Sequence, residues 1–112
     1  MAMTAPPPSS ALFCPETSIL FICDIQERFR ELIHRMPHVI YSASLLNEAA
    51  AILSIPVMVT EQYPKALLHT VAEIDVEGEN TTVFEKTMFS MVTPVGVASL
   101  LDNIGAMGVK CL

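Results

Sequence analysis

The sequence contains no tryptophan, only four glycines and only six basic residues among its 112 residues. Twelve acidic residues oppose those six and give a net charge of −6, which disfavours a nucleic-acid-binding protein that neutralises phosphates. The three cysteines are odd in number and show no Cys-X-X-Cys spacing, which is typical of reduced thiols rather than a disulfide scaffold. Because 52% of the residues are hydrophobic, the composition also excludes an intrinsically disordered chain.

Long hydrophobic runs are missing too. The longest nearly uncharged apolar stretch covers residues 49–60 and is interrupted by Ser54 and Pro56, whereas a membrane span needs roughly 20 apolar residues. The first basic residue is Arg28, so the basic start of a secretory signal and the arginines of a mitochondrial presequence are both absent. We therefore predict a cytoplasmic protein without a membrane partner.

The length allows one small domain. Residues 1–16 form a Pro/Ser-rich stretch that we expect to be a flexible lead-in, and residues 17–112 form the domain. The continuous apolar run 19–23 predicts a strand buried on both faces of a parallel sheet. Helical spacing of apolar residues follows Pro37, which interrupts the chain there, and predicts a helix over 39–53. The other predicted elements are strands at 57–59, 81–84 and 107–112 and a helix from Thr93–Pro94 to Ile104. This order predicts an α/β fold with a mostly parallel sheet, the front of a doubly wound arrangement.

Three polar clusters, at residues 24–26, 60–63 and 85–87, stand where ligands bind in such a sheet, at the carboxyl ends of the strands. Asp24 follows the first strand, and Lys86 comes at the comparable position of the third. A paired carboxylate and ammonium at this rim suit an active site, where the carboxylate takes a proton and the lysine holds charge or lowers the pKa of a neighbouring thiol. An ordinary rim salt bridge, or a helix-capping role for Asp24, explains the same pattern.

Other reactive residue types form no recognisable site. The three histidines lack metal-ligand spacing, and no Gly-rich loop follows the first strand, so we predict neither a metal nor a cofactor. Cys14 lies in the lead-in and is expected to be exposed and inert. Cys23 and Cys111 lie in predicted strands and are expected to be buried apolar residues.

Three segments, 23–29, 56–65 and 85–91, resemble the isochorismatase-like cysteine hydrolases. The resemblance implies a Rossmann-like three-layer α/β/α fold whose sheet has six parallel strands, so that this chain is truncated after the fourth strand. It also implies a protein that is usually oligomeric and acts on a small molecule. Relatives that cleave amides use an Asp-Lys-Cys triad, and Asp24 and Lys86 match its aspartate and lysine. The resemblance also places Gln26, Phe29 and Tyr63 on segments that border the substrate pocket. It implies no metal site, because Thr60-Glu61-Gln62 stands where metal-binding nicotinamidases carry an Asp-X-His element.

One part of the family pattern is missing from these residues. In the family the nucleophilic cysteine follows the fourth strand, and this chain stops at Leu112, before that turn. We therefore expect no hydrolysis by the 112 residues alone, since covalent catalysis needs the thiolate. We also expect self-association through the uncovered edge of the fourth strand. The alternative is a non-catalytic binding protein, or a truncated isoform that pairs with a full-length relative.

Overall fold

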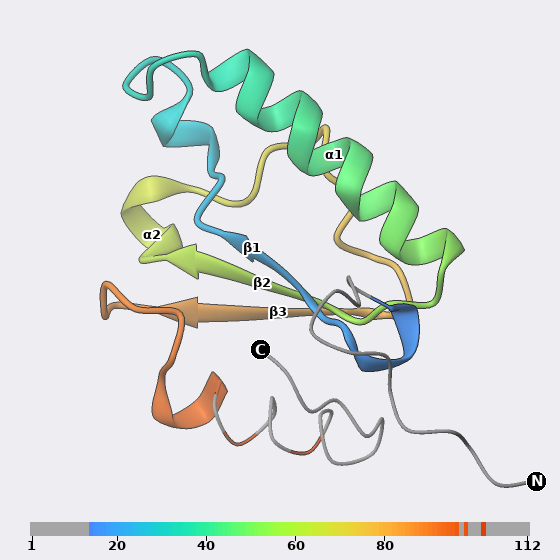
Figure 1. Cartoon of the computed structure of the whole chain (residues 1–112). Coiled ribbons are helices and arrows are strands. Elements are labelled where there is room, and N and C mark those ends of the chain that lie inside the picture. The colour runs from blue at the N-terminus through green and yellow to red at the C-terminus, as the bar shows by residue number, and fades with distance from the viewer. Residues whose placement is uncertain (1–13, 97, 99–101, 103–112) are drawn as a thin grey trace, which may run out of the picture.

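The computed structural model describes residues 14–96, 98 and 102, and shows a three-stranded parallel sheet. The strands β1 (Leu20–Cys23), β2 (Val57–Gln62) and β3 (Thr81–Lys86) lie in the order β1-β2-β3 (Figure 1). This confirms the α/β class and the parallel sheet. The predicted strand at 107–112 lies outside the described residues, as does most of the helix predicted up to Ile104.

The central strand β2 is nearly inaccessible to solvent along its whole length. Its register pairs Cys23 with Thr60 at the end of β1 and Gln62 with Lys86 at the end of β3. β2 therefore extends two residues beyond the last β1 pair at its carboxyl end. Because all three strands run in the same direction, their carboxyl ends meet at one rim of the sheet.

Helix α1 (Met36–Ile52) covers one face of the sheet (Figure 1). It begins three residues earlier than the predicted helix, and the expectation that Pro37 interrupts the chain is wrong. Pro37 occupies the first turn, where its missing N–H costs no hydrogen bond and its fixed φ suits the helix. The helix ends before Ser54, whose φ of 57° turns the chain toward β2.

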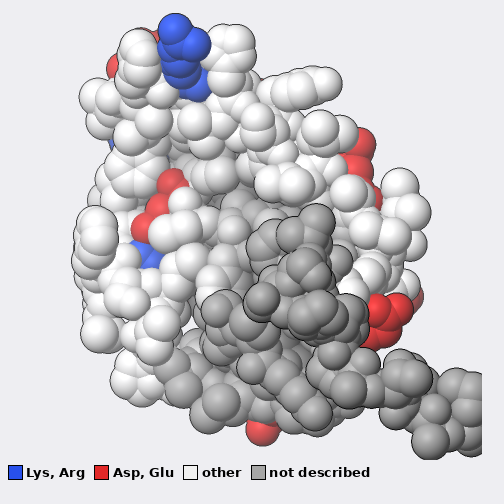
Figure 2. All heavy atoms as spheres, viewed as in Figure 1, with Lys and Arg blue, Asp and Glu red and all other residues white. Residues whose placement is uncertain are grey.

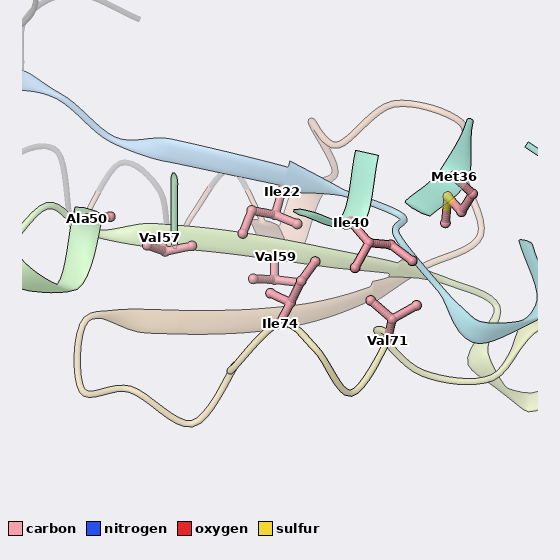
Figure 3. Close-up of a cluster of buried hydrophobic side chains, with 8 residues drawn as sticks. All are labelled: Ile22, Met36, Ile40, Ala50, Val57, Val59, Val71 and Ile74. Carbon is pink, nitrogen blue, oxygen red and sulfur yellow. The ribbon is translucent and has the colours of Figure 1, made fainter. Parts of the chain in front are cut away.

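The hydrophobic core lies between this face and α1 (Figure 3). The long connection from β2 to β3 contributes to the same core through Val71 and Ile74, which are 0% and 3% exposed. Three short helices complete the described elements: η1 (Pro15–Thr17), η2 (Glu27–Phe29) and α2 (Pro64–Leu67). The core residues drawn in Figure 3 are Ile22, Met36, Ile40, Ala50, Val57, Val59, Val71 and Ile74.

Residues 94–96 are helical and lie next to the opposite face of the sheet (Figure 1). The Thr93 hydroxyl accepts a hydrogen bond of 3.0 Å from the backbone N–H of Gly96, which confirms the predicted N-cap. A Cβ atom added at Gly96 would lie 3.3 Å from the Cε atom of Met58, so the first turn packs tightly against β2. Helix α1 and the helical residues 94–96 thus lie on opposite sides of the sheet.

The outer side of α1 exposes large apolar side chains. Tyr41 is 70% exposed, Leu45 54% and Ile52 82%. Figure 2 shows a face of the molecule on which charged side chains are sparse. Among the residues that the structure describes, no helix is long and apolar enough to cross a membrane.

Candidate functional site

Asp24 and Lys86 form an ion pair at the carboxyl rim of the sheet. The Lys86 Nζ atom lies 2.7 Å from Asp24 Oδ2, and the two side chains are 1% and 22% exposed. The two residues predicted from strand ends to lie close together therefore do so, across 62 residues of sequence. The near-complete burial of the ammonium distinguishes this pair from an exposed salt bridge, which contributes little to stability.

The carboxylate of Asp24 is held on both oxygens. Oδ2 receives the lysine, and Oδ1 accepts a 2.8 Å hydrogen bond from the hydroxyl of Thr60, which is 1% exposed. Asp24 adopts a φ of 54°, a left-handed conformation that aspartate tolerates better than most residues. The helix-capping alternative for Asp24 is wrong, because Gln26 occupies the N-cap position of the helix that follows.

Four oxygen atoms surround the Lys86 ammonium. Besides Asp24, its acceptors are Gln62 Oε1 at 2.8 Å and the backbone carbonyls of Met88 and Phe89, both at 3.1 Å. An ammonium group has three protons, so these acceptors use all of its hydrogen-bonding capacity. In this arrangement Lys86 is a fixed positive charge beside Asp24.

The three residues predicted to border the substrate occupy different surroundings. Gln26 is 0% exposed, and its amide bonds to the backbone of Gln62 and Leu68. Phe29 packs against the hydrophobic core. Tyr63, at 49% exposure, lines a cavity beside Lys86. For all three residues, contact with a substrate stays a prediction.

That cavity has a volume of about 420 Å³ and is lined by residues 63–65, 85–88 and 93–95. Its size is in the range of small-molecule sites. Its walls come from the start of α2, from the end of β3 with the two residues after it, and from residues 93–95, and they include both Lys65 and Glu85. In the described part of the chain, no group of three or more His, Cys, Asp and Glu side chains is arranged to hold a metal ion.

Residues 18–108 match a family model described as the isochorismatase domain. The chain belongs to this family. It is 47% identical over 95 residues to isochorismatase domain-containing protein 1 of Danio rerio, covering 85% of this chain and 33% of that protein. Against isochorismatase domain-containing protein 2 of Homo sapiens, it is 43% identical over 90 residues, covering 80% of this chain and 43% of that protein.

Solved structures show the same isochorismatase fold. The chain superposes with a TM-score of 0.72 and 45% identity on a structure described as the MAR1 ribonuclease of Caenorhabditis elegans. That superposition covers 81% of this chain and 48% of the other. Taken together, the chain spans between a third and a half of the length of these relatives.

The isochorismatase domain carries a second carboxylate on the same rim, Glu61, which lies in the predicted cluster 60–63 but for which the sequence predicted no role. The Glu61 side chain is 6% exposed, lies 2.9 Å from His69 Nδ1 and accepts hydrogen bonds from the N–H and hydroxyl of Thr70. Burial alone would raise the pKa of Glu61, but these hydrogen bonds outweigh it and lower that pKa. The hydrogen bond and charge of Glu61 in turn raise the pKa of His69. This pair anchors the segment after α2 to β2.

His69 should make the stability of the domain depend on pH. Because its pKa is higher in the folded chain than in the unfolded one, its stabilisation is complete below the unfolded value of about 6.5. The stabilisation is lost as pH rises through the folded pKa. In urea unfolding at about pH 6 and about pH 8.5, we expect His69→Gln to be destabilising at the lower pH and nearly neutral at the higher one. Equal effects at both pH values would contradict the ion pair.

Cys23 differs from its prediction, because the structure exposes it instead of burying it. Cys14 is exposed as predicted. Partial burial and the neighbouring charge of Asp24 raise the pKa of the Cys23 thiol. A nucleophilic cysteine needs the opposite shift, since the thiolate is the reactive form. The structure thus gives Cys23 no activated thiolate at neutral pH.

Proposed function

We propose that this isochorismatase domain carries the proton-accepting part of a hydrolase centre that cleaves an amide or related bond of a small molecule. The observation that supports this most strongly is the buried Lys86–Asp24 ion pair beside a cavity of about 420 Å³. Asp24 would accept the proton of an incoming thiol, and Lys86 would keep a fixed positive charge next to it. No cofactor is needed for this chemistry.

The proposed reaction has two steps. In the first, the thiol passes its proton to Asp24 while sulfur attacks the carbonyl carbon, and the C–N bond breaks as the amine leaves with a proton. In the second, water hydrolyses the thioester and restores the thiol. Because Cys23 lacks an activated thiolate, we expect the nucleophile to come from a different cysteine, and the 112 residues alone to be inactive.

A small-molecule substrate fits the charge of the chain better than a polyanion does. The name of the Caenorhabditis elegans structure describes a ribonuclease, but the 112 residues of this chain have a net charge of −6, and RNA binding relies on basic surfaces. We therefore do not extend a ribonuclease activity to this chain. We propose a cytoplasmic protein that acts without nucleic-acid or membrane partners and forms homo-oligomers.

The experiment is an assay of ammonia release from small primary amides by the protein purified from the cells that make it, with its C-terminus read by mass spectrometry. We expect peptides that continue beyond Leu112 to a cysteine, and turnover that Asp24→Asn lowers by about 100-fold or more. Glu79→Gln, at an exposed position in the connection that precedes β3, is the control. The folded fraction of each variant is measured in parallel by circular dichroism.

A second candidate is a binding protein without catalysis, which pairs with a full-length relative. The apolar outer side of α1 favours it, because large exposed apolar surfaces mark interaction sites. A mature protein that ends at Leu112, releases no ammonia and copurifies with a longer relative would replace the hydrolase proposal by this one.

A further inference from the structure

The side chain of Gln62 contacts Lys86, one member of the proposed catalytic pair. Neither the family match nor the proposed reaction gives Gln62 a role. Its Oε1 atom accepts a 2.8 Å hydrogen bond from the Lys86 ammonium, and its Nε2 atom donates to the carbonyl of Thr87 at 3.1 Å. These two partners fix the orientation of the amide, since the reverse orientation would point donors at the ammonium and an acceptor at the carbonyl. Gln62 thus connects β2 to both Lys86 and the turn after β3.

The register of the sheet explains this contact. Gln62 and Lys86 are direct partners in the β2–β3 ladder, so their side chains project from neighbouring positions on the same face. Thr60, two residues earlier on β2, projects from this face as well and reaches Asp24. Alternate residues of one strand therefore hold both members of the ion pair.

The backbone of Gln62 is itself fixed by a neighbouring side chain. β1 pairs with β2 only as far as Thr60, so the N–H and C=O groups of Gln62 on that side lack a strand partner. The buried side chain of Gln26 supplies both missing partners: its Oε1 accepts from the Gln62 N–H at 2.7 Å, and its Nε2 donates to the Gln62 carbonyl at 2.9 Å. The last residue of β2 is therefore as firmly placed as one inside the ladder.

We propose that Gln62 is a positioning residue that fixes the Lys86 ammonium against Asp24. The inference rests on the proposed function for its chemical consequence, because it assumes that the ion pair is the working part of the site. A neutral amide suits this position. It provides an acceptor for the ammonium without adding a second negative charge that would compete with Asp24 for it.

The test measures the Lys86 ammonium itself, by nitrogen-15 NMR of its proton exchange in the 112-residue chain. In the unsubstituted chain we expect a discrete, slowly exchanging signal, because the side chain is 1% exposed and fully hydrogen-bonded. Gln62→Met keeps a similar volume and removes the acceptor. We expect it to accelerate exchange by about tenfold or more, the factor that corresponds to a lost hydrogen bond to a charged group.

Three further variants separate positioning from general loss of structure. Gln62→Glu keeps an acceptor for the Lys86 ammonium and should exchange slowly. Gln62→Asn is too short to reach Lys86 and should exchange fast, so it provides the same test if Gln62→Met does not fold. Glu79→Gln, which is exposed, should leave the signal unchanged. Backbone exchange at Val59 reports on global unfolding and should stay the same in every variant that folds.

The outcomes keep the two proposals apart. The positioning role is overturned if the proton exchange of the Lys86 ammonium changes less than about twofold in both Gln62→Met and Gln62→Asn. It is also overturned if this exchange is already fast in the unsubstituted chain. If the protein purified from cells hydrolyses no amide, but Gln62→Met still accelerates proton exchange at Lys86, the proposed function is overturned and the positioning role stays in place.

Discussion

Asp24→Asn is expected to destabilise the chain by about 3–5 kcal/mol, the usual cost of removing one partner of a buried ion pair. The substitution preserves size and shape but leaves the Lys86 ammonium, whose side chain is 1% exposed, without a counter-charge. The remaining acceptors, which include the carbonyls of Met88 and Phe89, are neutral and do not replace the carboxylate. The measurement is the free energy of unfolding in urea, with the exposed Asp102→Asn as the matched control.

A double-mutant cycle identifies the cause of this loss. Lys86→Met removes the buried charge, so the combination of Asp24→Asn with Lys86→Met should be more stable than Asp24→Asn alone. If the two substitutions simply add, the destabilisation comes from packing or from the Thr60 hydrogen bond, and the ion pair does not account for it. The same data show how much of any lost activity in Asp24→Asn is due to unfolding.

The second large effect is expected in the connection between β2 and β3. Ile74→Ala should cost about 2–5 kcal/mol, because Ile74 is 3% exposed and packs in the core under α1. Ile52→Ala makes the same chemical change at a residue that is 82% exposed and should cost less than about 0.5 kcal/mol. Urea unfolding of the two variants compares them directly. Similar losses would mean that the connection does not belong to the core.

Much of this fold could be predicted from the sequence because its strands are continuous apolar runs. Residues 19–23 and 57–59 alternate neither in polarity nor in helical period, and such runs are typical of strands covered on both faces. β2 is buried in this way, but for β1 the prediction is wrong, because Phe21 and Cys23 are exposed. Once the strands are placed and taken as parallel, their carboxyl ends must meet. The closeness of Asp24 and Lys86 follows from that geometry alone, without knowledge of any side-chain contact.

The remainder of the site depends on register, which the sequence pattern does not specify. The side chain of Gln26 can bond to the backbone of Gln62 because β2 runs two residues past the last β1 pair. This offset is visible only in three dimensions. The strand pattern places Glu61 on the rim, but its partners His69 and Thr70 lie after α2, and only the three-dimensional structure shows that they bond to it. Pro37 was misinterpreted for a different reason, because a proline both ends helices and begins them.

The hydrogen bonds of Lys86 link the formation of the cavity to the last steps of folding. Its four oxygen atoms belong to three separate stretches of chain, around residues 24, 62 and 88–89. Contacts that span 62 residues form late, since a long loop must close first. The wall beside Lys86 is therefore complete only when all three strands have assembled. A partly folded chain would have no ligand cavity at this rim, and a ligand that binds there would select the fully assembled sheet.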